Sequence, residues 1–217
     1  MRKTFDDALL DVKSRTHIMF QSVRETYKRL FVAIKTHDNQ KAQTIIEKDA
    51  RINDLETSIN NDCMLIILKQ CPVARDLRFI IATIKIVNDL ERIADYAENI
   101  AVYLIKSEKD ITEQRHILLA YETTLMAMLD GMMQAYQKHD AACAKQCALK
   151  DDAIDALYHE HMHTFIKKAQ TLRSHDAYEA SRALLMIKQL ERAGDHLTNI
   201  AEHIVFSIEG KMIDINR

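Results

Sequence analysis

Glycine and proline are scarce in this sequence, which has three glycines and one proline among 217 residues. Because these two residues punctuate strands and tight turns, a chain with so few of them has few sharp corners and must be built from long helices. An all-β fold is therefore excluded. Long apolar runs are also missing, since no stretch reaches about 18 uncharged apolar residues. We expect no segment that crosses a membrane by itself.

A charge excess of one sign is absent too. The chain has 30 basic and 32 acidic residues and a formal net charge of −2. No overall basic field is available to hold nucleic acid or an anionic membrane surface. The first ten residues, MRKTFDDALL, place two aspartates where a signal peptide has its apolar region. We expect a cytoplasmic protein that does not bind nucleic acid.

The cysteines do not form a zinc-binding pattern. They show no CxxC spacing, and no pair of histidine or cysteine partners stands near the two that are one helical turn apart. In a cytosolic protein they are expected to be reduced thiols. The four residues are Cys63, Cys71, Cys143 and Cys147.

Apolar residues recur at helical spacing along nearly the whole chain, which predicts an all-α fold. The pattern breaks near residues 37–39, 71–72, 107–112, 139–140 and 174–176, so six helices are expected. Asp38 and Asp140 follow two of these breaks, where a side-chain oxygen accepts from free backbone N–H groups. Gly210 is expected to end the sixth helix. Short connections between such long rods force neighbouring helices to be antiparallel.

The chain repeats itself. AIKTHD at 33–38 matches AYQKHD at 135–140, and KDARIN at 48–53 matches KDDAID at 150–155. LERIADYAENIA at 90–101 then matches LERAGDHLTNIA at 190–201. The order of the segments is the same in both halves. We predict two tandem antiparallel three-helix bundles related by internal duplication, the first at 1–106 and the second at 112–217.

Acidic residues recur at equivalent places in the two repeats, beside the apolar stripes of the third and sixth helices. Like charges at i, i+4 repel, so each repeated pair needs a compensating cation. Oxygen ligands of this kind suit Mg²⁺, Ca²⁺ or Mn²⁺, and carboxylates in helical bundles also hold iron. The candidates are Glu91 and Asp95 with Asp49 and Asn53 in the first repeat, and Glu191 and Asp195 with Asp151 and Asp155 in the second.

A second interpretation needs no metal. Arg92 stands three residues from Asp95, and Arg192 stands three residues from Asp195, so arginine could neutralise both acidic faces. The protein would then be a metal-free helical adaptor. The recurrence of Glu-Arg and the following Asp in both repeats, amid divergent surface residues, favours a functional face.

Two longer segments carry a family resemblance. CPVARDLRFIIATIKIVNDLERIADYAENIA at 71–101 resembles the first-repeat signature of the PhoU family, and ERAGDHLTNIAEHI at 191–204 resembles its second. The resemblance covers essentially the whole chain. It implies two three-helix bundles and a regulator of phosphate uptake and phosphate-starvation signalling that contacts the phosphate ABC importer and a sensor histidine kinase. Homodimers are a further expectation from the family.

The resemblance also bears on the metal hypothesis. Some family members bind clustered metal ions through a Glu/Asp-xxx-Asp motif, which here falls on Glu91 and Asp95, on Glu191 and Asp195, and on Asp151 and Asp155. Asn53 replaces the second acid of the Asp49 copy. The implied ions are iron, manganese, magnesium or zinc. Because Asn53 is uncharged, the first-repeat site has one negative charge fewer than the second. We therefore expect the second-repeat site to hold its ion more tightly.

Two arginines are candidates for partner binding. Arg75 and Arg78 open the third helix, where cations oppose the helix dipole, and a partner contact would explain them. Pairing with acids of a neighbouring helix is the alternative. The second repeat has His175-Asp176-Ala177-Tyr178 at the corresponding place.

A di-iron enzyme is the main competing function. Glu113 with His116, and Glu160 with His163, match the Glu-x-x-His element of di-iron carboxylate bundles. No nucleophile–base pair and no phosphate-cradling glycine loop accompany them. We therefore expect a protein without enzymatic activity.

Overall fold

The structure is a computed structural model that describes residues 2–106, 112–169 and 174–215. Side chains are described for residues 5–106, 114–167 and 181–215. The described chain forms eight helices and no strand, so the all-α prediction is confirmed. The helices are α1 (Arg2–Thr36), α2 (Asn39–Gln70), α3 (Ala74–Ile105), α4 (Thr112–Leu119), α5 (Glu122–Lys138), α6 (Ala141–Ala148), α7 (Asp151–Ala169) and α8 (Ser174–Glu209).

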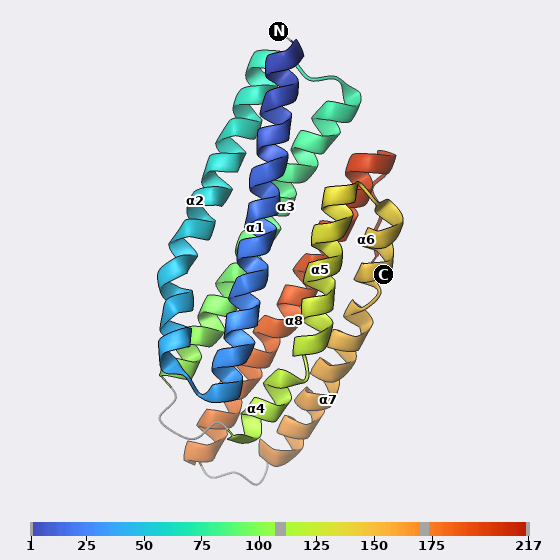
Figure 1. Ribbon diagram of the computed structural model, residues 1–217. Coiled ribbons are helices and arrows are strands. Elements are labelled where there is room, and N and C mark those ends of the chain that lie inside the picture. The colour runs from blue at the N-terminus through green and yellow to red at the C-terminus, as the bar shows by residue number, and fades with distance from the viewer. Residues whose placement is uncertain (1, 107–111, 170–173, 216–217) are drawn as a thin grey trace.

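The helices form two antiparallel bundles that lie side by side (Figure 1). Helices α1, α2 and α3 make the first bundle. In the second, α4 and α5 together make one rod, α6 and α7 make another, and α8 is the third. The two predicted three-helix bundles are thus present. The boundary at 107–111 lies outside the described residues, so the domain limits of 106 and 112 stay a prediction.

Two of the six predicted rods are interrupted, which accounts for eight helices instead of six. Between α4 and α5, the N–H of Tyr121 donates to the carbonyl oxygen of Leu118 at 3.4 Å. Between α6 and α7, the N–H of Lys150 donates to the carbonyl oxygen of Cys147 at 3.2 Å. Both are the tighter i→i+3 bonds of a 3₁₀ turn. The second break places Asp151 in the first turn of α7.

The predicted capping residues act as caps. Asp38 accepts from the N–H groups of Gln40 and Lys41 at the start of α2, and Asp140 accepts from the N–H of Cys143 at the start of α6. Gly210, at φ 72°, follows α8, and its N–H donates to the carbonyl oxygen of Phe206 at 3.0 Å. Three non-glycine residues end other helices in the left-handed region, which explains how the chain turns with so little glycine: His37, Cys71 and His139.

The centre of the molecule is the packing of α3 against α8, which joins the two bundles (Figure 1). The repeated segments 90–101 and 190–201 lie on these two central helices. Their apolar stripes are fully buried, in α3 at Leu90, Ile93, Ala94, Ala97, Ile100 and Ala101 and in α8 at Leu190, Ala193, Leu197, Ile200, Ala201 and Ile204. Burial at i, i+3, i+4 and i+7 is the helical pattern expected of a core face.

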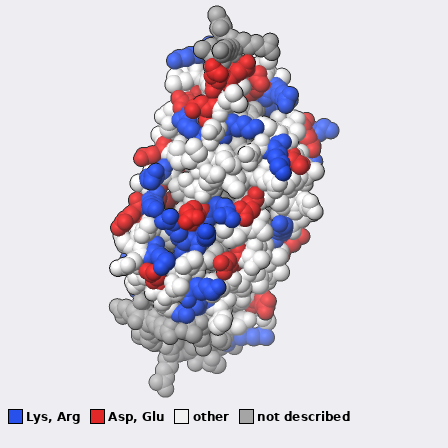
Figure 2. Space-filling model, viewed as in Figure 1, with Lys and Arg blue, Asp and Glu red and all other residues white. Residues whose placement is uncertain are grey.

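The surface carries mixed charge. On the face shown in Figure 2, Lys and Arg are interspersed with Asp and Glu, with uncharged areas between them. Within the described ranges, every helix is too short or too polar to span a membrane.

Candidate metal centres

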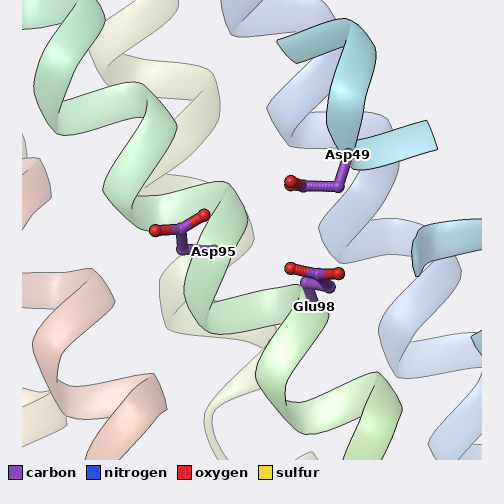
Figure 3. A group of neighbouring side chains, drawn as sticks. All are labelled: Asp49, Asp95 and Glu98. Carbon is purple, nitrogen blue, oxygen red and sulfur yellow. The ribbon is translucent and has the colours of Figure 1, made fainter. Parts of the chain in front are cut away.

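Three carboxylates of the first repeat gather between α2 and α3 (Figure 3). Asp49 on α2 and Asp95 and Glu98 on α3 each offer an oxygen, and these oxygens lie within 4.8 Å of one another. The i, i+3 spacing of Asp95 and Glu98 puts both on the same face of α3. Asp49 is 8% exposed.

The first cluster is electrostatically unfavourable without a cation. Burial raises the pKa of Asp49, Asp95 and Glu98 above their ordinary values, and repulsion by neighbouring carboxylates raises the pKa of Asp49 and Glu98 further. These shifts mean that the charged forms are disfavoured where they stand. A bound cation would favour the charged forms and so oppose both effects.

Asn53, predicted as a ligand, hydrogen-bonds the cluster. Its Nδ2 donates to Asp49 Oδ2 at 2.9 Å. Its Oδ1 is buried and has no hydrogen-bond partner within the described part of the chain. An orphaned buried oxygen beside three carboxylates fits the ligand set of a hard cation.

Glu91, also predicted as a ligand, stands beside the three-carboxylate group. Its Oε2 lies 3.7 Å from Arg92 Nε. Burial raises the pKa of Glu91, and the charges of Asp95, Glu56 and Asp49 add to that rise. Glu91 therefore shares the electrostatic field of the cluster, and Glu98 joins Asp49 and Asp95 in the three-carboxylate group.

The second repeat has its own three-carboxylate group between α7 and α8. Oxygens of Asp155, Glu191 and Asp195 lie within 4.8 Å of one another. All three were predicted as ligands. Glu191 is 8% exposed. Burial raises the pKa of Asp195, and the charges of Glu191 and Asp155 raise it further.

Asp151 completes this group from the first turn of α7. It is 4% exposed, and its Oδ2 accepts from Thr198 Oγ1 at 3.0 Å. Its Oδ1 has no hydrogen-bond partner among the residues that the structure describes. Burial, together with repulsion by Asp155, Asp195 and Glu191, raises the pKa of Asp151 to about 7. A half-satisfied, buried carboxylate is a second feature that suits the coordination of a cation.

A glycine makes room for Asp151. A Cβ built on Gly194 of α8 would stand 2.2 Å from Asp151 Oδ1. No real Cβ approaches an oxygen so closely, so the glycine lets the carboxylate reach the helix surface. Position 194 corresponds to Ala94 in the first repeat.

The two clusters carry the same formal charge once Glu98 is included, which corrects the count behind the sequence analysis. The first contains Asp49, Glu91, Asp95 and Glu98, and the second contains Asp151, Asp155, Glu191 and Asp195. Glu98 corresponds to Thr198, whose hydroxyl binds Asp151 instead of adding a charge. Charge count alone gives no reason for the second site to bind an ion more tightly.

Only part of the expected arginine compensation is present. Arg92, whose side chain is 61% exposed, has Nη1 3.6 Å from Asp95 Oδ2. In the second cluster the nearby cation is Lys188, whose Nζ lies 2.5 Å from Glu191 Oε2. Arg192 instead interacts with Tyr96, whose pKa is raised by burial despite the opposing charge and hydrogen bond of Arg192. The exposed Arg92–Asp95 pair stabilises by about 0–1 kcal/mol, too little to offset the carboxylates of the first cluster, and Lys188 brings a single positive charge to the four carboxylates of the second.

The remaining predicted sites lie elsewhere. Arg75 is exposed and lines a cavity, and the guanidinium of Arg78 packs over Gly210. Of the Glu-x-x-His elements, His116, Glu160 and His163 are exposed, and the side chain of Glu113 lies outside the described set. The exposed residues do not point into a bundle interior, as a di-iron centre requires.

Two helical bundles built from one duplicated unit, each with a carboxylate cluster between two helices, define a class of duplicated all-α proteins with candidate metal centres. The PhoU domain model matches residues 16–104 and 122–204. The chain belongs to the PhoU family.

Relatives match over nearly the full length. The chain is 31% identical to a phosphate-specific transport system accessory protein PhoU homolog of Clostridium acetobutylicum, over 99% of both chains. It is 32% identical to the Pseudomonas aeruginosa homolog, over 95% of this chain and 86% of that one. The crystal structure of the phosphate transport system regulatory protein PhoU from Streptococcus pneumoniae superimposes with a TM-score of 0.86, at 29% identity, covering 97% and 99% of the two chains.

Proposed function

We propose that this protein is an accessory regulator of phosphate transport that acts by binding other proteins and catalyses no reaction. The observation that carries the proposal is the full-length similarity to proteins named as accessory or regulatory components of phosphate transport. Deletion of the gene tests it. Loss of the regulator should raise phosphate-repressed alkaline phosphatase in phosphate-rich medium, and unchanged repression would contradict the role.

The proposed partners are subunits of the phosphate ABC importer and a sensor histidine kinase. The family resemblance is the basis of this choice. Pull-down from membranes of cells grown in high phosphate, in mild detergent, should recover importer ATPase or kinase subunits with the tagged wild-type chain. A pull-down with an unrelated tagged helical bundle provides the control. Recovery of neither partner would contradict this part of the proposal.

We further propose that both carboxylate clusters hold metal ions. Support comes from the two sets of convergent oxygens and from the buried, unpartnered Oδ1 atoms of Asn53 and Asp151. When bound, an ion such as Fe, Mn²⁺, Mg²⁺ or Zn²⁺ would neutralise the clustered carboxylates. The chain's own contribution is to fix their positions on packed helices.

Elemental analysis of protein purified without chelator tests the metal proposal. Glu191→Ala with Asp195→Ala should remove metal from the second cluster, and Glu91→Ala with Asp95→Ala should reduce it in the first. Asp152→Ala with Glu160→Ala changes two exposed acids of α7 and is the matched control. Equal metal content in all variants, or none in the wild type after incubation with the four ions, would contradict the proposal.

A further inference from the structure

A cavity of about 400 Å³ lies away from both carboxylate clusters, among α1, α3, α8 and the residue that ends α5. Three basic side chains line it: Lys13 from α1, Arg75 from α3 and His139. They come from parts of the chain that are far apart in the sequence, so the fold itself gathers them. One carboxylate, Asp76, also lines the cavity.

In the described part of the chain, Lys13 and Arg75 are not ion-paired, although one carboxylate, Asp76, shares the cavity wall. Within the described side chains, Lys13 and Arg75 have no carboxylate within 4.0 Å, in contrast to Lys145, whose Nζ lies 2.7 Å from Glu209 Oε1. Burial lowers the pKa of Lys13. Burial also lowers the pKa of His139, and the charges of Lys13 and Arg75 lower it further. The cavity is therefore a region of unbalanced positive charge.

The rest of the wall is apolar. It includes Leu9, Phe79 and Ile208, and the ring centre of Phe79 lies 5.9 Å from that of His139. Pockets that take small organic ligands measure roughly 300–1,000 Å³ and combine apolar walls with a few polar groups. The cavity falls in that range. A bare inorganic ion would leave the apolar wall in contact with water.

We propose that this cavity binds a small organic phosphate, with the phosphate against Lys13, Arg75 and His139 and an apolar or aromatic part against Phe79. Two fixed cations and a titratable imidazole match a phosphate monoester, whose charge at neutral pH lies between −1 and −2. Bound phosphate also offsets the penalty of placing Arg75 in the first turn of α3. The ligand set is separate from the carboxylate clusters and shares no residue with them.

Calorimetric titration of the full chain tests the proposal, with chelator present so that metal at the clusters does not bind phosphate. The probes are adenosine 5′-monophosphate, adenosine and inorganic phosphate. We expect saturable binding of the nucleotide, no binding of adenosine, and inorganic phosphate weaker than the nucleotide by at least tenfold. Lys13→Gln and Arg75→Gln should each weaken nucleotide binding by roughly tenfold.

Two further variants make the test specific. Lys35→Gln removes an exposed cation at the end of α1, outside the cavity, and should leave the affinity unchanged. His139→Asn keeps a residue that tolerates the left-handed backbone at φ 52° while removing the titratable ring, and should weaken binding. Circular dichroism confirms that each variant is folded. The proposal is overturned if the nucleotide does not bind, if adenosine or inorganic phosphate binds equally well, or if Lys35→Gln weakens binding as much as Lys13→Gln does.

Discussion

Tyr96 and His196 occupy the same position in the two repeats, and their side chains meet: Tyr96 Oη lies 3.0 Å from His196 Nε2. Residues related by a two-fold symmetry contact each other only near its axis, so this pair marks the pseudo-two-fold axis between α3 and α8. His196 Nδ1 lies 2.8 Å from Asp89 Oδ1. Since a carboxylate only accepts, Nδ1 donates there, which leaves Nε2 of the same ring facing the Tyr96 hydroxyl.

The first prediction concerns Asp89, which joins the two bundles through His196 and through His203, whose Nε2 lies 3.4 Å from Asp89 Oδ2. Burial acts to raise the pKa of Asp89, but the hydrogen bonds from the two histidines outweigh it and the pKa is lowered. Asp89→Asn should reduce the free energy of unfolding by about 1–3 kcal/mol at pH 7.

The pH dependence of this loss has a defined sign. A carboxyl whose pKa is lower in the folded state stabilises above its unfolded pKa of about 3.9, and the stabilisation disappears as pH falls through the folded value. The difference between wild type and Asp89→Asn in urea unfolding should shrink below about pH 4. Asp54→Asn, at an exposed position, is the control. An equal loss in both variants would contradict the prediction.

The second prediction concerns the contact between Gly194 and Asp151. Alanine in a helix interior is ordinarily more stable than glycine by about 1 kcal/mol. Gly194→Ala should instead lower the free energy of unfolding by about 1–3 kcal/mol, because its Cβ displaces Asp151 Oδ1. In the Asp151→Ala background the same substitution should be neutral or stabilising. Additive effects in this double-mutant cycle would show that the two sites are not coupled.

The third prediction concerns the pH dependence of stability that follows from the raised pKa of Asp151. Its pKa of about 7 lies above the unfolded value of about 3.9. Between these two pH values, the metal-free native state therefore keeps a proton on Asp151 that the unfolded state has lost. The free energy of unfolding should therefore fall as pH rises from about 4 to 7, by at most about 1.4 kcal/mol per pH unit from this group. Asp151→Asn should flatten the slope in chelator, and the exposed Asp152→Asn should not. An unchanged slope in Asp151→Asn would count against the raised pKa.

The fourth prediction concerns Glu98. If its carboxylate is part of the first cluster, Glu98→Gln should weaken metal binding there by roughly tenfold while leaving the second cluster intact. The measurement is competition for the ion with a chelator of known affinity. The protein also carries Glu191→Ala and Asp195→Ala, so that the measured affinity is that of the first cluster alone. Glu47→Gln, at an exposed position of α2, is the control. Identical affinities for Glu98→Gln and the control would exclude Glu98.

Much of the fold follows from local sequence features, because helical spacing and capping depend on residues close in the chain. The ends at Asp38, Asp140 and Gly210 were predicted from their chemistry, and the structure confirms them. The breaks before Tyr121 and Asp151 were missed. Neither is marked by glycine or proline, and the helical apolar pattern continues through both.

The clusters were predicted in part, since spacing within one helix shows which residues share a face but not which residue of the next helix lies opposite. The pairing of Asp155 with Glu191 and Asp195 was predicted from duplication. Glu98 was not predicted as a ligand, although it stands in the acidic row of α3. The reason is that duplication favours residues shared by both repeats, and position 198 is threonine. Lys188 was missed although it stands three residues before Glu191, the same spacing that pairs Arg92 with Asp95.

The break between α6 and α7 gives the two clusters different electric fields despite their equal charge. Asp49 lies well inside α2, whereas Asp151 lies in the first turn of α7. The unpaired N–H groups at a helix start carry a partial positive charge, which stabilises a nearby anion by about 0.3–1 kcal/mol. Part of the negative charge of the second cluster is therefore already offset by backbone dipoles. The dipole offsets only part of the penalty on Asp151, because burial and the neighbouring carboxylates still raise its pKa to about 7.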